Sequence, residues 1–197
     1  MIANLIRRAA LPLLLVPSLA LPAAPAAAIG AELTYEVWSN AMQVMNLVVS
    51  FQADGESYSV ELKAELMGPP AWFESYRLRS GVEGRLADGG PQPVAYRTEA
   101  RTDSKKVKWI ELAFEQPSQP AMSSDPPFSP HIRPALDEAA LAGSRDPLSA
   151  IFALLQATDA AGTCNGESKV YDGRRRFDLK MMEHDETLPA DLFKPAE

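Results

Sequence analysis

The stretch Tyr58–Leu66, with the sequence YSVELKAEL, decides the fold, because apolar and polar side chains alternate along it without a break. Successive side chains of a β-strand point to opposite faces. The apolar face is formed by Tyr58, Val60, Leu62, Ala64 and Leu66, and the polar face by Ser59, Glu61, Lys63 and Glu65. One face therefore meets a core and the other meets water, as in an antiparallel sheet covered on a single side.

The same period of two recurs on both sides of this stretch, with glycine-containing turn signals between the runs. Further strands are predicted at Leu33–Trp38, Met42–Phe51, Leu78–Leu86, Val94–Arg101, Val107–Phe114, Ser168–Tyr171 and Arg175–Glu183. Met42–Phe51 is apolar on both faces, which predicts a central strand covered on both sides. Gln116–Pro134 contains six prolines and predicts a loop within one domain.

One helix is predicted at Pro147–Thr158, because Asp146 is a good N-cap residue and Pro147 suits the first helical position. Its apolar stripe is formed by Leu148, Ile151, Phe152 and Leu155. Together the elements predict a mainly β domain. We expect an antiparallel curled sheet (half-barrel) of about seven or eight strands, with one main α-helix packed across the open side.

The N-terminus has the three parts of a cleavable signal peptide. Arg7 and Arg8 are basic, Ala9–Ala20 is apolar, and small residues end at Ala28. The alternative is a membrane anchor, but four prolines interrupt the segment and the apolar run is shorter than the about 20 residues that span a bilayer. We therefore expect residues 1–28 to be removed and residues 29–197 to form a single soluble, exported domain.

Charge and cysteine content exclude several classes of partner. The chain carries 19 basic and 26 acidic residues, and two of the basic ones lie in the signal segment, so the mature part has a net charge of −9. This balance argues against nucleic acid as a partner. Cys164 is the single cysteine, so no internal disulfide is expected. The chain also has only two histidines, His131 and His184, which are too few to form a zinc cluster with Cys164. The sequence therefore predicts no metal site and no cofactor.

Several segments in order resemble a bacterial envelope family, the domain of unknown function 3108. The resemblance is carried by Leu33–Val37, Tyr58–Leu66 followed by Gly68, Ser80–Gly84 ahead of Pro93–Tyr96, Asp146–Ser149 and Val170–Leu179. It implies a periplasmic protein of Gram-negative bacteria. The implied fold is a curved sheet similar to the half-barrels of periplasmic lipoprotein carriers. The family brings no catalytic residues to carry over.

Two groups of candidate site residues follow. The predicted apolar-ligand surface contains Tyr58, Val60, Leu62, Leu66, Trp72, Phe73, Phe177, Leu179 and Met181. We expect the last three to extend the apolar face of Tyr58–Leu66 from the final strand. The aromatic pair is also compatible with a short helical turn in Ala71–Tyr76 that plugs the core. The predicted anion site contains Arg174 and Arg176, with a solvated charged hairpin as its alternative.

A nucleophile elbow is the remaining catalytic motif to consider. Gly162–Gly166 encloses Cys164 between glycines, and His184 and Asp185 would complete a triad on paper. An elbow needs a strand before the nucleophile and a helix after it, and the predicted order here is the reverse. The sequence therefore favours a non-enzymatic periplasmic protein that binds or carries an apolar, lipid-like ligand. The alternative is an envelope interaction or assembly protein with a sealed core.

Overall fold

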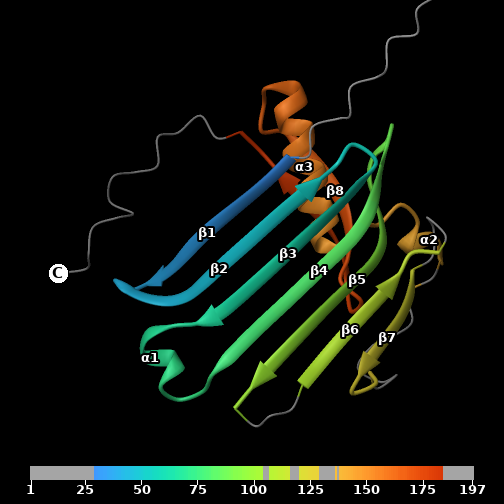
Figure 1. The fold of residues 1–197 in the computed structure, drawn as a ribbon. Coiled ribbons are helices and arrows are strands. Elements are labelled where there is room, and N and C mark those ends of the chain that lie inside the picture. The colour runs from blue at the N-terminus through green and yellow to red at the C-terminus, as the bar shows by residue number, and fades with distance from the viewer. Residues whose placement is uncertain (1–28, 104–106, 116–119, 129–135, 137, 184–197) are drawn as a thin grey trace, which may run out of the picture.

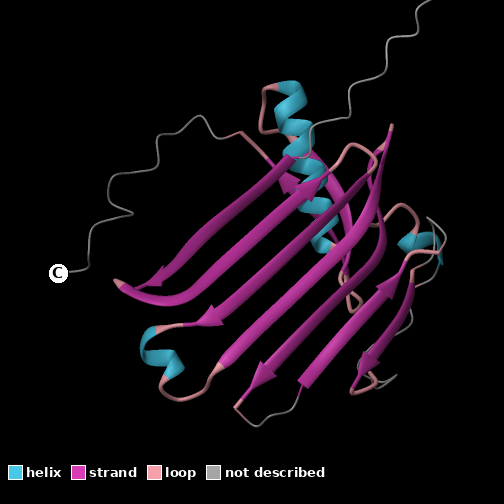
Figure 2. Cartoon of the chain, viewed as in Figure 1, coloured by secondary structure: helices cyan, strands magenta, loops and turns pink. Residues whose placement is uncertain are grey.

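A computed structural model of the chain describes residues 29–103, 107–115, 120–128, 136 and 138–183. Strands make up most of this chain, and α3 is the long helix (Figure 2). The main sheet contains β1 Ile29–Ser39, β2 Met42–Ala53, β3 Ser57–Leu66, β4 Tyr76–Ala87, β5 Gly90–Thr102, β6 Val107–Ala113 and β7 Ala121–Asp125. The remaining elements are α1 Gly68–Ala71, α2 Glu138–Leu141, α3 Pro147–Ala161, β8 Gly166–Tyr171 and β9 Arg176–Met181.

The main sheet is an antiparallel meander in which the strands pair in the order of the sequence, from β1 to β7. It is open and twisted, and α3 lies on one side of it together with β8 (Figure 1). We call this side the inner face and the opposite side the outer face. The predicted mainly β class, the antiparallel order and the single main helix are thus confirmed.

The core lies on the inner face, under α3 and the β8–β9 hairpin. Paired residues of neighbouring strands point to the same side of a sheet, so a row of partners crosses it. The covered row is Phe51, Val60, Val82, Tyr96, Leu112 and Met122. The first five of these side chains are buried, and they pack with Leu148 of α3 and Tyr171 of β8.

Helix α3 begins and ends where local chemistry requires. Asp146 accepts hydrogen bonds from the backbone N–H groups of Leu148 and Ser149, each at 3.0 Å, as an N-cap. Gly162 follows the last turn in the left-handed conformation, and its N–H bonds the carbonyl of Thr158. The predicted start is confirmed, and the helix extends three residues beyond the predicted end.

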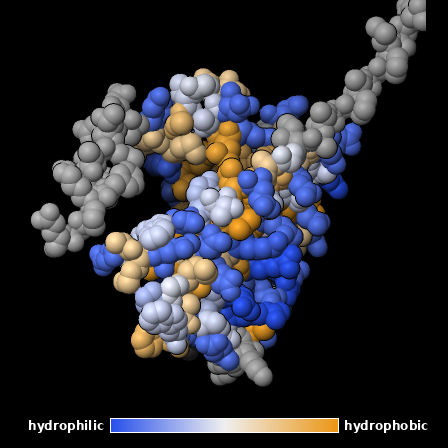
Figure 3. Space-filling model, turned by 60° about the vertical axis from the view of Figure 1, so that its left-hand side comes forward, coloured by the Kyte–Doolittle hydropathy of each residue, from blue (hydrophilic) through white to orange (hydrophobic). Residues whose placement is uncertain are grey.

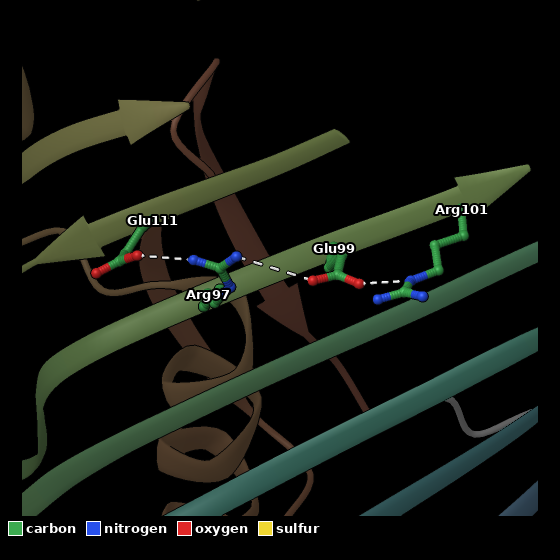
Figure 4. A network of polar contacts seen from close by, with 4 residues as sticks. All are labelled: Arg97, Glu99, Arg101 and Glu111. Carbon is green, nitrogen blue, oxygen red and sulfur yellow. Dashed lines mark hydrogen bonds and ion pairs between the residues drawn. The ribbon is translucent and has the colours of Figure 1, made fainter. Parts of the chain in front are cut away.

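The outer face carries charged pairs that keep it in contact with water. Arg97 bonds Glu111 at 2.9 Å and lies 3.8 Å from Glu99, which also pairs with Arg101 at 2.7 Å (Figure 4). Each exposed pair of this kind contributes little to stability, on the order of 0–1 kcal/mol. The outer face is therefore a charged surface, and the core of the described part of the chain lies on the inner face.

Two predictions about the main sheet require correction. The predicted loop contains strand β7, because Ala121–Asp125 pairs with β6 between the prolines. Strand β2 is covered on its inner side, where Phe51 stacks on Phe152 of α3, and it also contacts β1, β3 and α1 within the described chain. Its outward valines, such as Val48, instead lie among charged side chains of the outer face.

The end of the chain also differs from its prediction. Strand β9 pairs with β8 in a separate two-stranded sheet and adds no strand to the main one. The reason is that the backbone of Arg145, just before α3, forms a parallel β-bridge with Val170 of β8. This bridge holds the hairpin beside the helix. Helix α1 plugs no core, because Trp72 and Phe73 after it are exposed.

Candidate functional site

Helix α3 covers the part of the inner face that contains Tyr58 and Val60. Phe152 stacks on Tyr58 with ring centroids 5.1 Å apart, and on Phe51 at 5.9 Å. Tyr58 and Val60 are buried there, so these two predicted ligand contacts are covered by the chain's own side chains. The sequence shows that they face inward, but not that a helix lies on top of them.

A buried polar chain anchors this sealed part. The Tyr58 hydroxyl lies 2.6 Å from Oγ of Ser149, and that hydroxyl donates to the Asp146 carboxylate. Because the Ser149 hydrogen is used on Asp146, the Tyr58 hydroxyl is the donor in the first bond. Burial raises the pKa of Tyr58, and it raises the pKa of Asp146 from 3.8 to about 6 despite its hydrogen bonds. The network fixes α3 on β3.

The other half of the inner face is open. The open row runs across six strands and consists of Tyr35, Leu47, Ala64, Leu78, Ala100 and Lys108. Ala64 is buried, and the other five residues are partly or fully exposed. On β1, the inward-facing Leu33, Tyr35 and Val37 are 39%, 51% and 39% exposed. Hydrophobic surface gathers in the hollow below the top of α3, next to the hydrophilic outer face (Figure 3). Water therefore reaches an apolar surface of the kind that marks binding sites.

The structure distributes the remaining predicted ligand contacts over three places. Leu62 and Leu66 lie on the inner face of β3, partly buried. Trp72 and Phe73 are 79% and 88% exposed next to α1. The predicted contacts of the last strand lie on β9, outside the main sheet, and are Phe177, Leu179 and Met181. Of the predicted set, the two leucines are thus the residues on the inner face that α3 does not bury.

A groove of about 640 Å³ joins the open row to the β8–β9 hairpin. Its floor includes Leu78, Ala100 and Ile110 of the main sheet. Lys108 and Arg174 also line it, and the guanidinium carbon of Arg174 lies 4.7 Å from the ring centroid of Phe128. The groove therefore combines an apolar floor with two cationic side chains at its β6 end.

The structure separates the two arginines of the predicted anion site. Arg174 lies in the turn before β9 and faces the groove. Arg176 begins β9, and its guanidinium binds both carboxylate oxygens of Asp178, at 2.8 and 3.0 Å. A strand that included both arginines would place them on one face, but β9 begins at Arg176 and the strand period does not apply to Arg174 in the turn. Arg176 is paired with Asp178, and Arg174 remains a candidate anion ligand.

Cys164 lies in the exposed segment between α3 and β8. A helix therefore precedes it and a strand follows it, which is the order that the sequence predicted and the reverse of a nucleophile elbow. His184 and Asp185 lie outside the described residues, as does His131. Among the residues that the structure describes, no group of three or more potential metal ligands forms a cluster.

Sequence reasoning missed the most exposed part of this surface. Alternation in Leu33–Val37 was visible, but it does not tell which strand the helix leaves uncovered. The sequence signal for Lys108 is a charged residue at an inward position of a strand. A cation at such a position is expected to face solvent, a ligand or an ion partner.

The fold and the site define this chain as a mainly β protein built on one open antiparallel sheet with a partly covered inner face. It belongs to the family described as "Protein of unknown function (DUF3108)", whose model matches residues 32–193. No curated protein matches the chain, and no solved structure matches it either. In the part of the chain that is described, no helix is long and apolar enough to cross a bilayer.

Proposed function

We propose that this chain is a non-enzymatic periplasmic protein that binds or carries an apolar, lipid-like ligand on the open half of its inner face. The observation that carries the proposal is the exposure of Leu33, Tyr35 and Val37 on the open half of the inner face. A concave apolar surface with a few polar groups is the usual form of a small-molecule site. A likeness to the half-barrels of lipoprotein carriers is part of this proposal, and it is an analogy of fold.

A second candidate function is favoured by a different observation. Strand β1 is an end strand of the main sheet, so one side of its backbone pairs with no described strand. Such an edge is a template for an added strand from another protein. The alternative function is therefore an envelope interaction or assembly protein that uses this edge and holds no small ligand.

Tyr35→Asp is the variant that tests ligand binding. Because Tyr35 is half exposed, the substitution is expected to leave the fold intact while it places a carboxylate against the ligand's apolar part. We expect a fluorescent long-chain fatty acid to bind the variant roughly tenfold more weakly than the wild type. The measurement is a fluorescence titration, with a thermal melt of both proteins to confirm folding.

Thr34→Asp is the matched control, since Thr34 precedes Tyr35 on the same strand and points to the outer face. It adds the same charge and should leave the affinity unchanged. If the wild type shows no saturable binding of the probe, the carrier proposal is contradicted. Capture of an envelope protein by the wild type, lost when β1 is altered, would then support the second candidate.

Export provides a separate prediction. Strand β1 begins at Ile29, so cleavage after Ala28 leaves every described element intact. N-terminal sequencing of the protein recovered from a periplasmic extract is expected to start at Ile29 or within a few residues of it. A product that keeps Met1 and sediments with membranes would contradict the signal-peptide interpretation.

A further inference from the structure

The open row carries a chemical gradient across the sheet. Its β1–β4 part consists of Tyr35, Leu47, Ala64 and Leu78, and its β6 end is Lys108. Neighbouring strands lie about 4.8 Å apart, so the row extends over roughly 24 Å from Tyr35 to Lys108. A ligand that follows the row therefore meets apolar side chains along its length and a positive charge at one end.

The β8–β9 hairpin adds a second cation at the same end. Gly173 packs directly on Ile110, and a Cβ there would lie 2.5 Å from the Ile110 side chain. Ile110 is the inward-facing neighbour of Lys108 on β6, two residues along the strand. This close approach brings the following residue, Arg174, to the groove that Lys108 lines. The guanidinium carbon of Arg174 lies 4.7 Å from the ring centroid of Phe128, a cation–π contact that uses no N–H donor in an ion pair.

Several cations of the outer face are neutralised by neighbouring carboxylates, although Arg85 on that face forms no ion pair with a described residue. Lys63, Arg79 and Arg97 each form ion pairs with glutamates. Within the described residues, neither Lys108 nor Arg174 forms an ion pair. An anion bound between them would supply the missing partner.

Two carboxylates also line the groove, and neither forms an ion pair with Lys108 or Arg174. Asp172 accepts hydrogen bonds from the backbone N–H groups of Arg174 and Arg175, each at 2.6 Å, and so holds the turn. Asp125 pairs with Trp109 in the sheet and by register belongs to the outer face. Among the described residues, Lys108 and Arg174 therefore have no carboxylate within ion-pair distance, and both can contact an anion in the groove.

We propose that the open inner face binds the anion of a long-chain fatty acid. The carboxylate lies between Lys108 and Arg174, and the chain follows the open row towards Tyr35. This inference rests on the proposed function, because it specifies the ligand of the same surface. A single-chain ligand suits a groove of about 640 Å³, which is within the usual range of small-molecule sites.

The test compares palmitate with hexadecanol, which has the same chain and a neutral head group. Each displaces cis-parinaric acid from the purified protein at low ionic strength. We expect palmitate to bind roughly tenfold more tightly than hexadecanol, because a charge-assisted hydrogen bond adds to the shared apolar contact. Added salt should reduce this preference, since the two cations lie in a groove open to solvent.

Lys108→Gln and Arg174→Gln are the diagnostic variants, and Lys63→Gln on the outer face is the control. The first two should each weaken palmitate binding roughly tenfold and leave hexadecanol binding unchanged. The control should change neither. Equal affinities of palmitate and hexadecanol for the wild type would overturn this inference and leave the proposed function standing. Failure of cis-parinaric acid and both competitors to bind would overturn the two together.

Discussion

Gly84→Ala is expected to destabilise the protein by about 3 kcal/mol, a large share of the stability of a typical domain. Gly84 lies at the irregular register between β4 and β5. A Cβ at this position would overlap the backbone oxygen of Gln92 and the ring of Tyr58. Neither neighbour can move freely, because one belongs to the β5 ladder and the other is buried under α3. Urea unfolding of the purified variant measures the loss.

Gly81→Ala is the matched control, three residues earlier on the same strand. Gly81 faces outward, and an added Cβ would meet the carbonyl oxygen of Val60 at an ordinary 4.0 Å. This change should alter stability by less than about 1 kcal/mol, because glycine is itself unfavourable inside a strand. Similar losses in both variants would show that the Tyr58 contact is not tight.

The fold was largely predictable because its signals are local. The alternation in Tyr58–Leu66 and the Asp146-Pro147 pair depend on strand period and helix capping, and both are confirmed. Strand β7 was missed because flanking prolines indicate a loop, while its pairing depends on the position of β6. Similarly, β9 has the strand period, but the period does not state which strand is its partner.

The candidate site was less predictable, because it depends on what α3 leaves uncovered. Tyr58 and Leu62 belong to the same alternating face, yet the first is buried by Phe152 and the second lies only partly buried at its border. The same helical stripe divides: Leu148 enters the core, and Ile151 and Leu155 remain exposed. Which of these side chains are exposed depends on how the helix packs on the sheet. The sequence of a single strand or helix does not determine that packing.

Asp146 is the residue through which pH should act on stability. Its side chain is fully buried at the start of α3 and accepts hydrogen bonds from Leu148 and Ser149. Burial, the largest influence, raises its pKa from 3.8 to about 6, because the charged form loses water. A carboxyl group with a raised folded-state pKa contributes its full stability below pH 4. That contribution is lost as the pH rises through about 6.

Other carboxyl groups act in the opposite direction, so the wild type alone does not isolate this effect. Hydrogen bonds from Ser57 lower the pKa of Asp54, and hydrogen bonds from Ser75 lower that of Asp103. The stability that these two groups contribute is lost on acidification. The informative quantity is therefore the difference in unfolding free energy between the wild type and an Asp146 variant at each pH.

Asp146→Asn keeps an N-cap oxygen for the backbone N–H groups and removes the ionisation. At pH 7.5 we expect this variant to be more stable than the wild type by on the order of 3 kcal/mol. The amide is neutral, so the variant avoids the cost of burying a charged carboxylate, which corresponds to a shift of about two pKa units. The gap should narrow from pH 6 downwards and close near pH 4. Asp146→Ala lacks both cap and acceptor, so it should be less stable than Asp146→Asn by about 2 kcal/mol at every pH. Urea unfolding of the three proteins between pH 4 and pH 8 measures both gaps. A gap between wild type and Asp146→Asn that stays constant over this range would mean that Asp146 keeps its ordinary pKa inside the fold.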